Sequence, residues 1–188
     1  ALCTVAFVGV SVVVLGQDAW RAFAAFLPQF GTLAVEQGGN MMWPGMPTAF
    51  ALGRSIGLSV NGAYLLHGLV AAPAVLAMAF LWAQRARFEL RAASFILATL
   101  LLQPYVMFYD LAWLILPMAF LLRDGNRLPL SPLEWIVFAL AWVAPAQALL
   151  SAYLHQYLNV LPIVMIALLV MLVRRHLAMT AAAPAYQP

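Results

Sequence analysis

The sequence has 188 residues, of which 66% are apolar and 8% are charged, whereas soluble domains carry about 25% charged residues. Its cations are all Arg, and the formal net charge is only +3, which is too small an excess to indicate nucleic-acid binding. One cysteine, Cys3, excludes a disulfide within the chain. The composition excludes a soluble globular domain and predicts an all-α, polytopic bundle of transmembrane helices in a lipid bilayer.

Residues 1–16 are apolar from the first residue, which is not Met, and they lack the cationic start of a signal peptide. We expect them to end a span that began earlier, in a longer protein of which this chain is a C-terminal fragment. Residues 17–58 should form an extracytoplasmic segment at the membrane interface. It should contain a surface helix with an apolar stripe of Trp20, Phe23, Leu27 and Phe30. A short helix over residues 47–56 should follow, with Gly57 past its end.

The rest of the chain alternates apolar stretches with Arg clusters, which predicts about five spans in all. The apolar stretches are residues 59–83, 92–122, 133–150 and 158–173. The Arg clusters lie in residues 85–91, 123–127 and 174–175. Because cytoplasmic loops collect Arg, we expect all three clusters and the C-terminus on the cytoplasmic side. The transmembrane domain should cover residues 1–179, and residues 180–188 should be a disordered tail.

Residues 92–122 should form a broken hairpin. A continuous helix of 31 residues would be about 46 Å long, against about 30 Å for the hydrocarbon core, and would put its flanking Arg clusters on opposite sides of the membrane. Pro104 removes a backbone donor and disfavours helix at Gln103. Counted from Phe88, the outgoing arm over residues 88–103 should be about 24 Å long, and the return arm over residues 108–122 about 22 Å. Neither arm spans the core. The turn over residues 103–110 should therefore be recessed and line a cavity open to the extracytoplasmic side.

Three segments follow one another in a recognisable order. They are Trp20-Arg21-Ala22-Phe23, Met46-Pro47-Thr48-Ala49-Phe50-Ala51-Leu52 and Pro104-Tyr105-Val106-Met107-Phe108-Tyr109-Asp110-Leu111. Over residues 17–175 the chain resembles the C-terminal half of glycosyltransferase family 87, the bacterial family of polyprenyl-phosphate-mannose-dependent mannosyltransferases with a GT-C membrane fold.

The resemblance implies an enzyme of the bacterial inner membrane. It would move a hexose, mannose in that family, from a polyprenyl-phosphate donor to an acceptor hydroxyl at the extracytoplasmic face, without a cofactor. The family's proposed catalytic base is an Asp in the first extracytoplasmic loop, so the resemblance implies that the base lies upstream of this sequence.

Six residues are candidates for binding the donor or the acceptor: Asn40, Trp43, Arg54, Tyr105, Tyr109 and Asp110. Arg binds phosphate through two N–H groups, so Arg54 is a candidate for the donor phosphate, with lipid headgroups or Glu36 as alternative partners. Tyr105 and Tyr109 would line the cavity or serve as ordinary interfacial anchors. For Asn40 and Trp43 the alternatives are acceptor contact and loop packing.

Asp110 is an ionisable residue at membrane depth, where such residues are costly and face a cavity or a partner. Three roles remain open for it. It could cap a helix by accepting backbone N–H groups, contact a sugar hydroxyl or an ion-pair partner, or act as the catalytic base. His67 and His155 have no second His or acid at helical spacing, so no metal site is expected.

A transporter or permease subunit is the alternative function. Transporters also contain broken helices near the middle of the membrane, but these usually come in pairs within an internal repeat. No repeat is visible in the sequence, which favours the glycosyltransferase.

Overall fold

A computed structural model describes residues 2–147 and 159–182 of the protein. The side chains of Ala34, Asn40, Met41 and Ala182 are also outside this description. The regular elements in the described ranges are all helical, which confirms the expected all-α class. The chain divides into two compact units between Met42 and Trp43, and each unit is described by itself.

The first unit contains α1 (Leu2–Leu15), α2 (Gln17–Phe30), the π-helix η1 (Gly31–Glu36) and α3 (Gly39–Met42). The chain bends by 111° between α1 and α2. The bend falls at Gly16, whose φ of +84° is favourable only for glycine. In α2, the expected surface helix, Phe23 and Leu27 of the apolar stripe are 54% and 53% exposed. An exposed apolar stripe of this kind suits a membrane interface.

The second unit begins with the 3₁₀ turn η2 (Trp43–Gly45), α4 (Ala49–Ser55) and α5 (Val60–Ala83). Thr48 caps α4, because its hydroxyl accepts the N–H of Ala51 at 3.1 Å. Gly57 follows the helix with a φ of +88°, so the short helix expected before it is confirmed. α4 packs closely on α5, and a Cβ on Gly53 would lie 3.1 Å from the Cα of Ala63.

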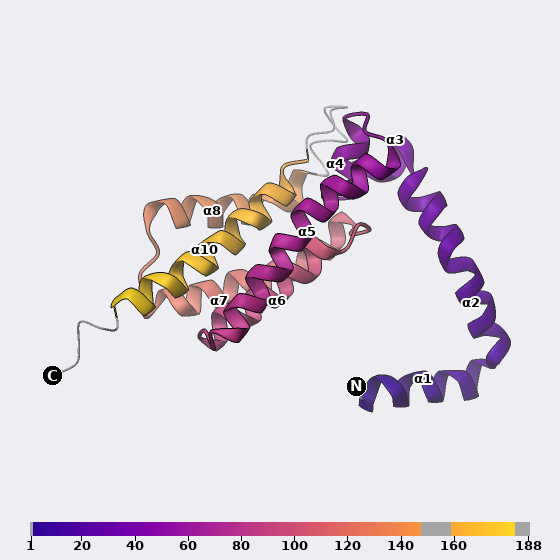
Figure 1. Cartoon of the computed structure of the whole chain (residues 1–188), viewed down its shortest axis with the longest axis horizontal. Helices are drawn as coiled ribbons and strands as arrows, with labels where there is room; N and C mark the ends of the chain where they lie inside the picture. The colour runs from indigo at the N-terminus through magenta and orange to yellow at the C-terminus, as the bar shows by residue number, and fades with distance from the viewer. Residues whose placement is uncertain (1, 148–158, 183–188) are drawn as a thin grey trace. The chain divides into compact units, whose positions relative to one another are not determined.

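The hairpin consists of α6 (Phe88–Leu102), the 3₁₀ helix η3 (Phe108–Leu114) and α7 (Ile115–Gly125). α6 and α7 pack side by side (Figure 1). Gln103 has the extended backbone, with φ −82° and ψ 121°, that a following proline favours. Arg87 at the start of α6 forms an ion pair with Asp124 in the last turn of α7. The start of α6 and the end of α7, which are the ends farthest from the turn at Pro104, therefore lie together. This arrangement confirms the broken hairpin.

α8 (Pro132–Val143), η4 (Ala144–Ala146) and α10 (Leu161–Ala182) complete the described part of the chain. By length and composition, α5 and α10 can each cross a membrane, and the bent pair α1–α2 would add a third span. The described residues thus support two or three full spans, where about five were expected. The expected span over residues 133–150 is represented by the shorter α8 and η4, and its end lies outside the described residues.

The course of α10 corrects one expectation. The last span was expected to stop at Val173, before Arg174 and Arg175, but α10 continues through both Arg residues to Ala182. Arg is a good helix former, and a charged side chain at the end of an apolar segment does not end the helix. Residues 180–182 of the expected tail are therefore helical, and residues 183–188 lie outside the described part.

The core of the second unit lies between α5, α6, α7 and α10. It contains the buried side chains of Leu81, Leu90, Leu97, Leu121, Leu168 and Leu172. The outer surface is apolar as well: Leu69, Trp113 and Ile163 are 65%, 59% and 62% exposed. Helices that are apolar on all sides belong in a membrane or inside a large protein, and the length of α5 and α10 indicates the membrane.

Candidate functional site

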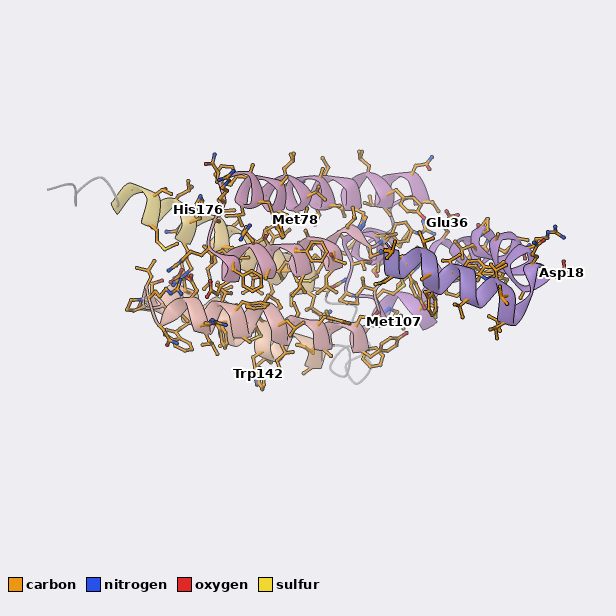
Figure 2. All side chains as sticks on the ribbon, turned by 90° about the horizontal axis from the view of Figure 1, so that it is seen from below. Asp18, Glu36, Met78, Met107, Trp142 and His176 are labelled. Atoms are coloured by element: carbon orange, nitrogen blue, oxygen red, sulfur yellow. The ribbon has the colours of Figure 1, made fainter. Side chains whose placement is uncertain are left out.

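The second unit has polar side chains at both ends, which Met107 and His176 mark in Figure 2. At one end lie η2 and the turn between α6 and α7, here called the tyrosine turn (residues 103–110). The other is the Arg-rich end (residues 85–91, 123–127 and 174–175). The tyrosine-turn end carries five of the expected site residues, which are Trp43, Arg54, Tyr105, Tyr109 and Asp110. Asn40 belongs to the first unit, and its side chain is outside the described part.

α6 stops well short of the neighbouring end of α5. The Nε2 atom of the buried His67 on α5 lies 3.1 Å from the carbonyl oxygen of Leu102, the last residue of α6. A carbonyl can only accept, so Nε2 carries the proton and donates. With a rise of 1.5 Å per residue, His67 lies about 10 Å along α5 from Val60. His67 thus caps the end of α6. The end of α6 therefore lies beside α5 about two helical turns from the start of α5.

Asp110 holds the tyrosine turn together. Its Oδ2 atom accepts the N–H of Met107 at 2.9 Å, and its own N–H donates to the carbonyl of Met107, also at 2.9 Å. This reciprocal pair of hydrogen bonds closes the first turn of η3 in the manner of a helix cap. Of the three roles left open by the sequence, the cap is therefore the one with an observed contact.

The two tyrosines of the turn are linked to each other. The side chains of Tyr105 and Tyr109 share a hydrogen bond, and Tyr109 is 60% exposed. The pair offers hydroxyl groups and aromatic faces.

Arg54 and Trp43 form a second pair. The guanidinium carbon of Arg54 lies 4.8 Å from the centroid of the Trp43 ring, which is a cation–π contact. The Nη1 atom also donates to the carbonyl of Leu58 at 2.7 Å. These contacts fix a cation in the last turn of α4, where the helix dipole favours positive charge.

The segment that carries Trp43 comes close to the tyrosine turn at Gly45. A Cβ at this position would lie 3.2 Å from Cε of Met107 and 3.7 Å from Cδ1 of Phe108. η2, which begins with Trp43, therefore packs on the tyrosine turn. One end of the bundle thus combines a guanidinium, an indole, two phenols and a carboxylate that organises the backbone.

Two amide side chains that the sequence interpretation missed support this end. Asn159 donates to the carbonyl oxygens of Met46 and Thr48 at 3.1 and 3.0 Å. Gln147 accepts the N–H of Val160 at 2.8 Å. Asn159 thus ties the segment before α4 to the start of α10, and Gln147 ties the end of η4 to it. In the sequence, Asn159 and Gln147 are recognisable only as polar amides next to apolar stretches. That pattern does not identify their hydrogen-bond partners.

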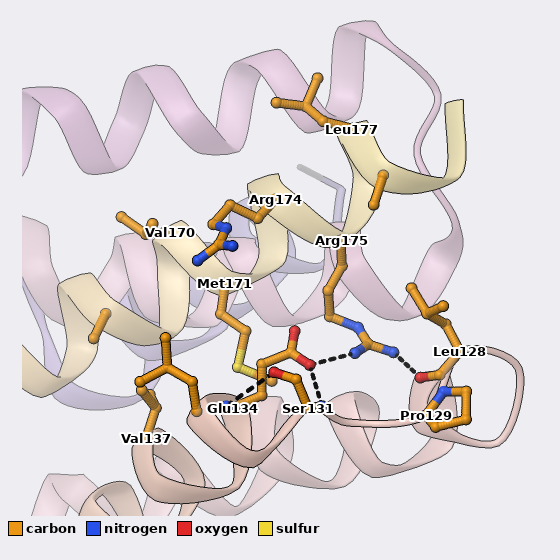
Figure 3. A pocket seen from close by; sticks show the side chains of 13 residues that line it. Leu128, Pro129, Ser131, Glu134, Val137, Val170, Met171, Arg174, Arg175 and Leu177 are labelled. Atoms are coloured by element: carbon orange, nitrogen blue, oxygen red, sulfur yellow. Dashed lines mark hydrogen bonds and ion pairs between the residues drawn. The ribbon is translucent and has the colours of Figure 1, made fainter. Parts of the chain in front are cut away.

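A buried ion-pair network lies at the Arg-rich end and was also missed. Asp124 is wholly buried and pairs with Arg87 and with Arg175, whose Nε lies 2.7 Å from Oδ2. The Arg175 side chain is 2% exposed, lies 3.1 Å from Glu134 and donates to the carbonyl of Leu128. Figure 3 shows Arg175 reaching Glu134 and Leu128. The network connects α6, α7, α8 and α10.

No metal centre is apparent in the described ranges, where no three His, Cys, Asp or Glu side chains are placed to hold a metal ion. His67 caps α6, as shown above. His176 packs edge-on against Phe80, with ring centroids 6.0 Å apart. His155, the remaining histidine, lies outside the described residues.

Comparison with protein families gives one match: the model of glycosyltransferase family 87 matches residues 1–104. The match covers the first unit, η2, α4, α5 and α6, and it ends at Pro104 in the tyrosine turn. Comparisons with curated proteins and with solved structures give no match. Since the match covers more than half of the chain, this protein belongs to glycosyltransferase family 87.

Proposed function

We propose that this membrane glycosyltransferase moves a hexose, specifically mannose, from a polyprenyl phosphate to an acceptor hydroxyl at the extracytoplasmic face of a bacterial inner membrane. Family membership supports glycosyl transfer. A lipid-linked donor suits a bundle whose outer surface is apolar, because the polyprenyl chain stays in the bilayer while its phosphate reaches polar groups at a helix end.

The packing of Gly45 on Met107 is the observation that carries the proposal, because it holds η2, whose Trp43 contacts Arg54, against the tyrosine turn. Transfer from a sugar phosphate requires stabilisation of the phosphate that leaves, and a guanidinium supplies several N–H donors for this task. Phenol hydroxyls bind sugar hydroxyls, and aromatic faces stack on sugar rings. The combination fits a phosphosugar better than it fits an ion or an apolar ligand.

Asp110 acts in this proposal as a positioning residue. Its carboxylate already accepts the N–H of Met107 and keeps Tyr105 and Tyr109 on the same turn. A general base must reach the acceptor proton, so the proposal assigns that role to a carboxylate other than Asp110.

The Arg-rich end is proposed to face the cytoplasm, because short loops rich in Arg stay on that side. Since Asp124 and Arg175 are paired there, α7 and α10 have their polar ends on the same side. The tyrosine turn then faces the extracytoplasmic side, and the C-terminus is cytoplasmic.

Arg54→Gln should raise the KM for the donor about tenfold, because a hydrogen bond to a charged group contributes about 1.5 kcal/mol or more. The measurement is transfer of radiolabelled mannose from polyprenyl-phosphate mannose by the purified protein. Arg21→Gln is the control: Arg21 also carries a positive charge, but it is 75% exposed and pairs with the exposed Asp18. We expect no change of KM in this control.

An unaltered donor KM in Arg54→Gln would remove Arg54 from the phosphate site. Absence of any transfer from polyprenyl-phosphate mannose by the full-length, folded enzyme would instead refute the proposed donor. The transporter alternative gains no support from the family match, which is to a glycosyltransferase family.

A further inference from the structure

Two apolar grooves flank α10 on the outer surface of the second unit. One has a volume of about 730 Å³ and lies between α8 and α10, lined by Val137, Met171 and Leu177 among others (Figure 3). The other has a volume of about 350 Å³ and lies between α5 and α10, lined by Leu69 and Pro73 among others. Volumes of 300–1,000 Å³ are typical of small-molecule sites.

The two grooves share Val170 and Arg174. Val170 is 50% exposed and forms a ridge between the grooves, while Arg174 lies one helical turn further along α10. A single cationic residue thus borders two separate apolar channels.

Arg174 carries the positive charge that this region leaves uncompensated. Its neighbour Arg175 is paired with Asp124 and Glu134, and the Glu134 carboxylate also accepts the N–H of Ser131 at 2.8 Å. Arg174 is exposed, and within residues 2–147 and 159–182 it has no ion pair or hydrogen bond from its side chain. The site therefore attracts an anion.

We propose that Arg174 and the two grooves bind one anionic diacyl glycerophospholipid, with the headgroup phosphate at Arg174 and one acyl chain in each groove. One charge beside two apolar channels matches one headgroup with two chains. A polyprenyl phosphate has a single chain and would fill only one groove. Basic side chains at the ends of transmembrane helices are known to attract anionic headgroups. This site lies at the Arg-rich end, apart from the tyrosine turn, so it does not depend on the proposed donor.

The proposal is tested by native mass spectrometry of the purified, delipidated protein with added lipids. Dioleoyl phosphatidylglycerol should bind about fivefold more tightly than dioleoyl phosphatidylcholine, as expected for one Arg near a headgroup. Arg174→Gln should remove this preference. Arg85→Gln is the matched control, because Arg85 is an exposed Arg at the same end of the bundle but lines neither groove; it should keep the preference.

The two-chain geometry is tested separately. Lysophosphatidylglycerol, with one chain, should bind more weakly than the diacyl lipid. Ala167→Trp fills the larger groove and should weaken phosphatidylglycerol binding, whereas Ala139→Trp on the exposed face of α8 should not.

Three results would overturn the proposal. They are equal binding of the anionic and zwitterionic lipids, a headgroup preference that survives Arg174→Gln, and binding of the one-chain lipid or of polyprenyl phosphate that is as tight as that of the diacyl lipid.

Discussion

Asp124→Asn should lower the free energy of unfolding by about 3–5 kcal/mol, because removing one partner of a buried ion pair leaves the other charge uncompensated. The substitution preserves the size of the side chain and removes its charge. The carboxylate of Asp124 pairs with both Arg175, which is 2% exposed, and Arg87. Both Arg side chains would then lose this negatively charged partner. Denaturant unfolding of the purified protein in detergent micelles measures the loss. The expected loss is a large share of the free energy of unfolding, which is about 5–15 kcal/mol for typical folded proteins.

Asp18→Asn is the matched control for Asp124→Asn. Asp18 also pairs with an Arg, but the two side chains are 96% and 75% exposed, and exposed pairs contribute only about 0–1 kcal/mol. The double variant Asp124→Asn with Arg175→Gln should be less destabilised than the sum of the two single variants, since the two residues act through one interaction. A loss below about 1 kcal/mol in Asp124→Asn would show that the pair does not stabilise the bundle.

The Arg residues illustrate what the sequence could and could not predict. Their clustering predicted which helix ends lie together, because charged groups avoid the bilayer core, and the ion pair of Arg87 with Asp124 agrees. It did not predict that Arg175 would be buried. Its partner Asp124 is 51 residues away in the sequence, and local spacing carries no information about such a contact.

The broken hairpin was predictable because its causes are local. Pro104 disturbs the backbone of Gln103 whatever the rest of the fold does, and the lengths of the two arms follow from the rise of a helix. The same is true of α4, where Thr48 at the start and Gly57 past the end are local signals. Predictions of this kind need no knowledge of tertiary packing.

The candidate site was predictable only as separate residues. The packing of Gly45 on Met107 joins segments about 60 residues apart, and the bond from Asn159 to Met46 joins residues 113 apart. The cation–π contact of Arg54 with Trp43 depends on how α4 turns back over η2. Tertiary packing decides all three contacts, so residue type and periodicity could nominate the side chains without assembling them.

Asp110→Ala should lower kcat for sugar transfer about a hundredfold, because a displacement of about 1 Å in a catalytic site can cost two orders of magnitude in rate. The Asp110 carboxylate accepts the N–H of Met107, and Ala leaves that N–H without its acceptor. The first turn of η3 would then loosen, and Tyr105 and Tyr109 would move. Steady-state transfer at saturating polyprenyl-phosphate mannose measures kcat, and thermal unfolding checks that the bundle remains folded.

Asp110→Asn separates positioning from direct chemistry. The Asn side chain keeps a carbonyl oxygen that can accept the Met107 N–H, since Asn and Asp cap helices about equally well, but it cannot take up a proton. If Asp110 acts by holding the tyrosine turn, Asn should restore most of the rate lost in Asp110→Ala and leave the pH profile of kcat unchanged. If Asn is as inactive as Ala, the charge itself is needed, and Asp110 contacts the reacting groups. The carboxylate of Asp110 would then act on the substrate, in addition to its observed hydrogen bond to Met107.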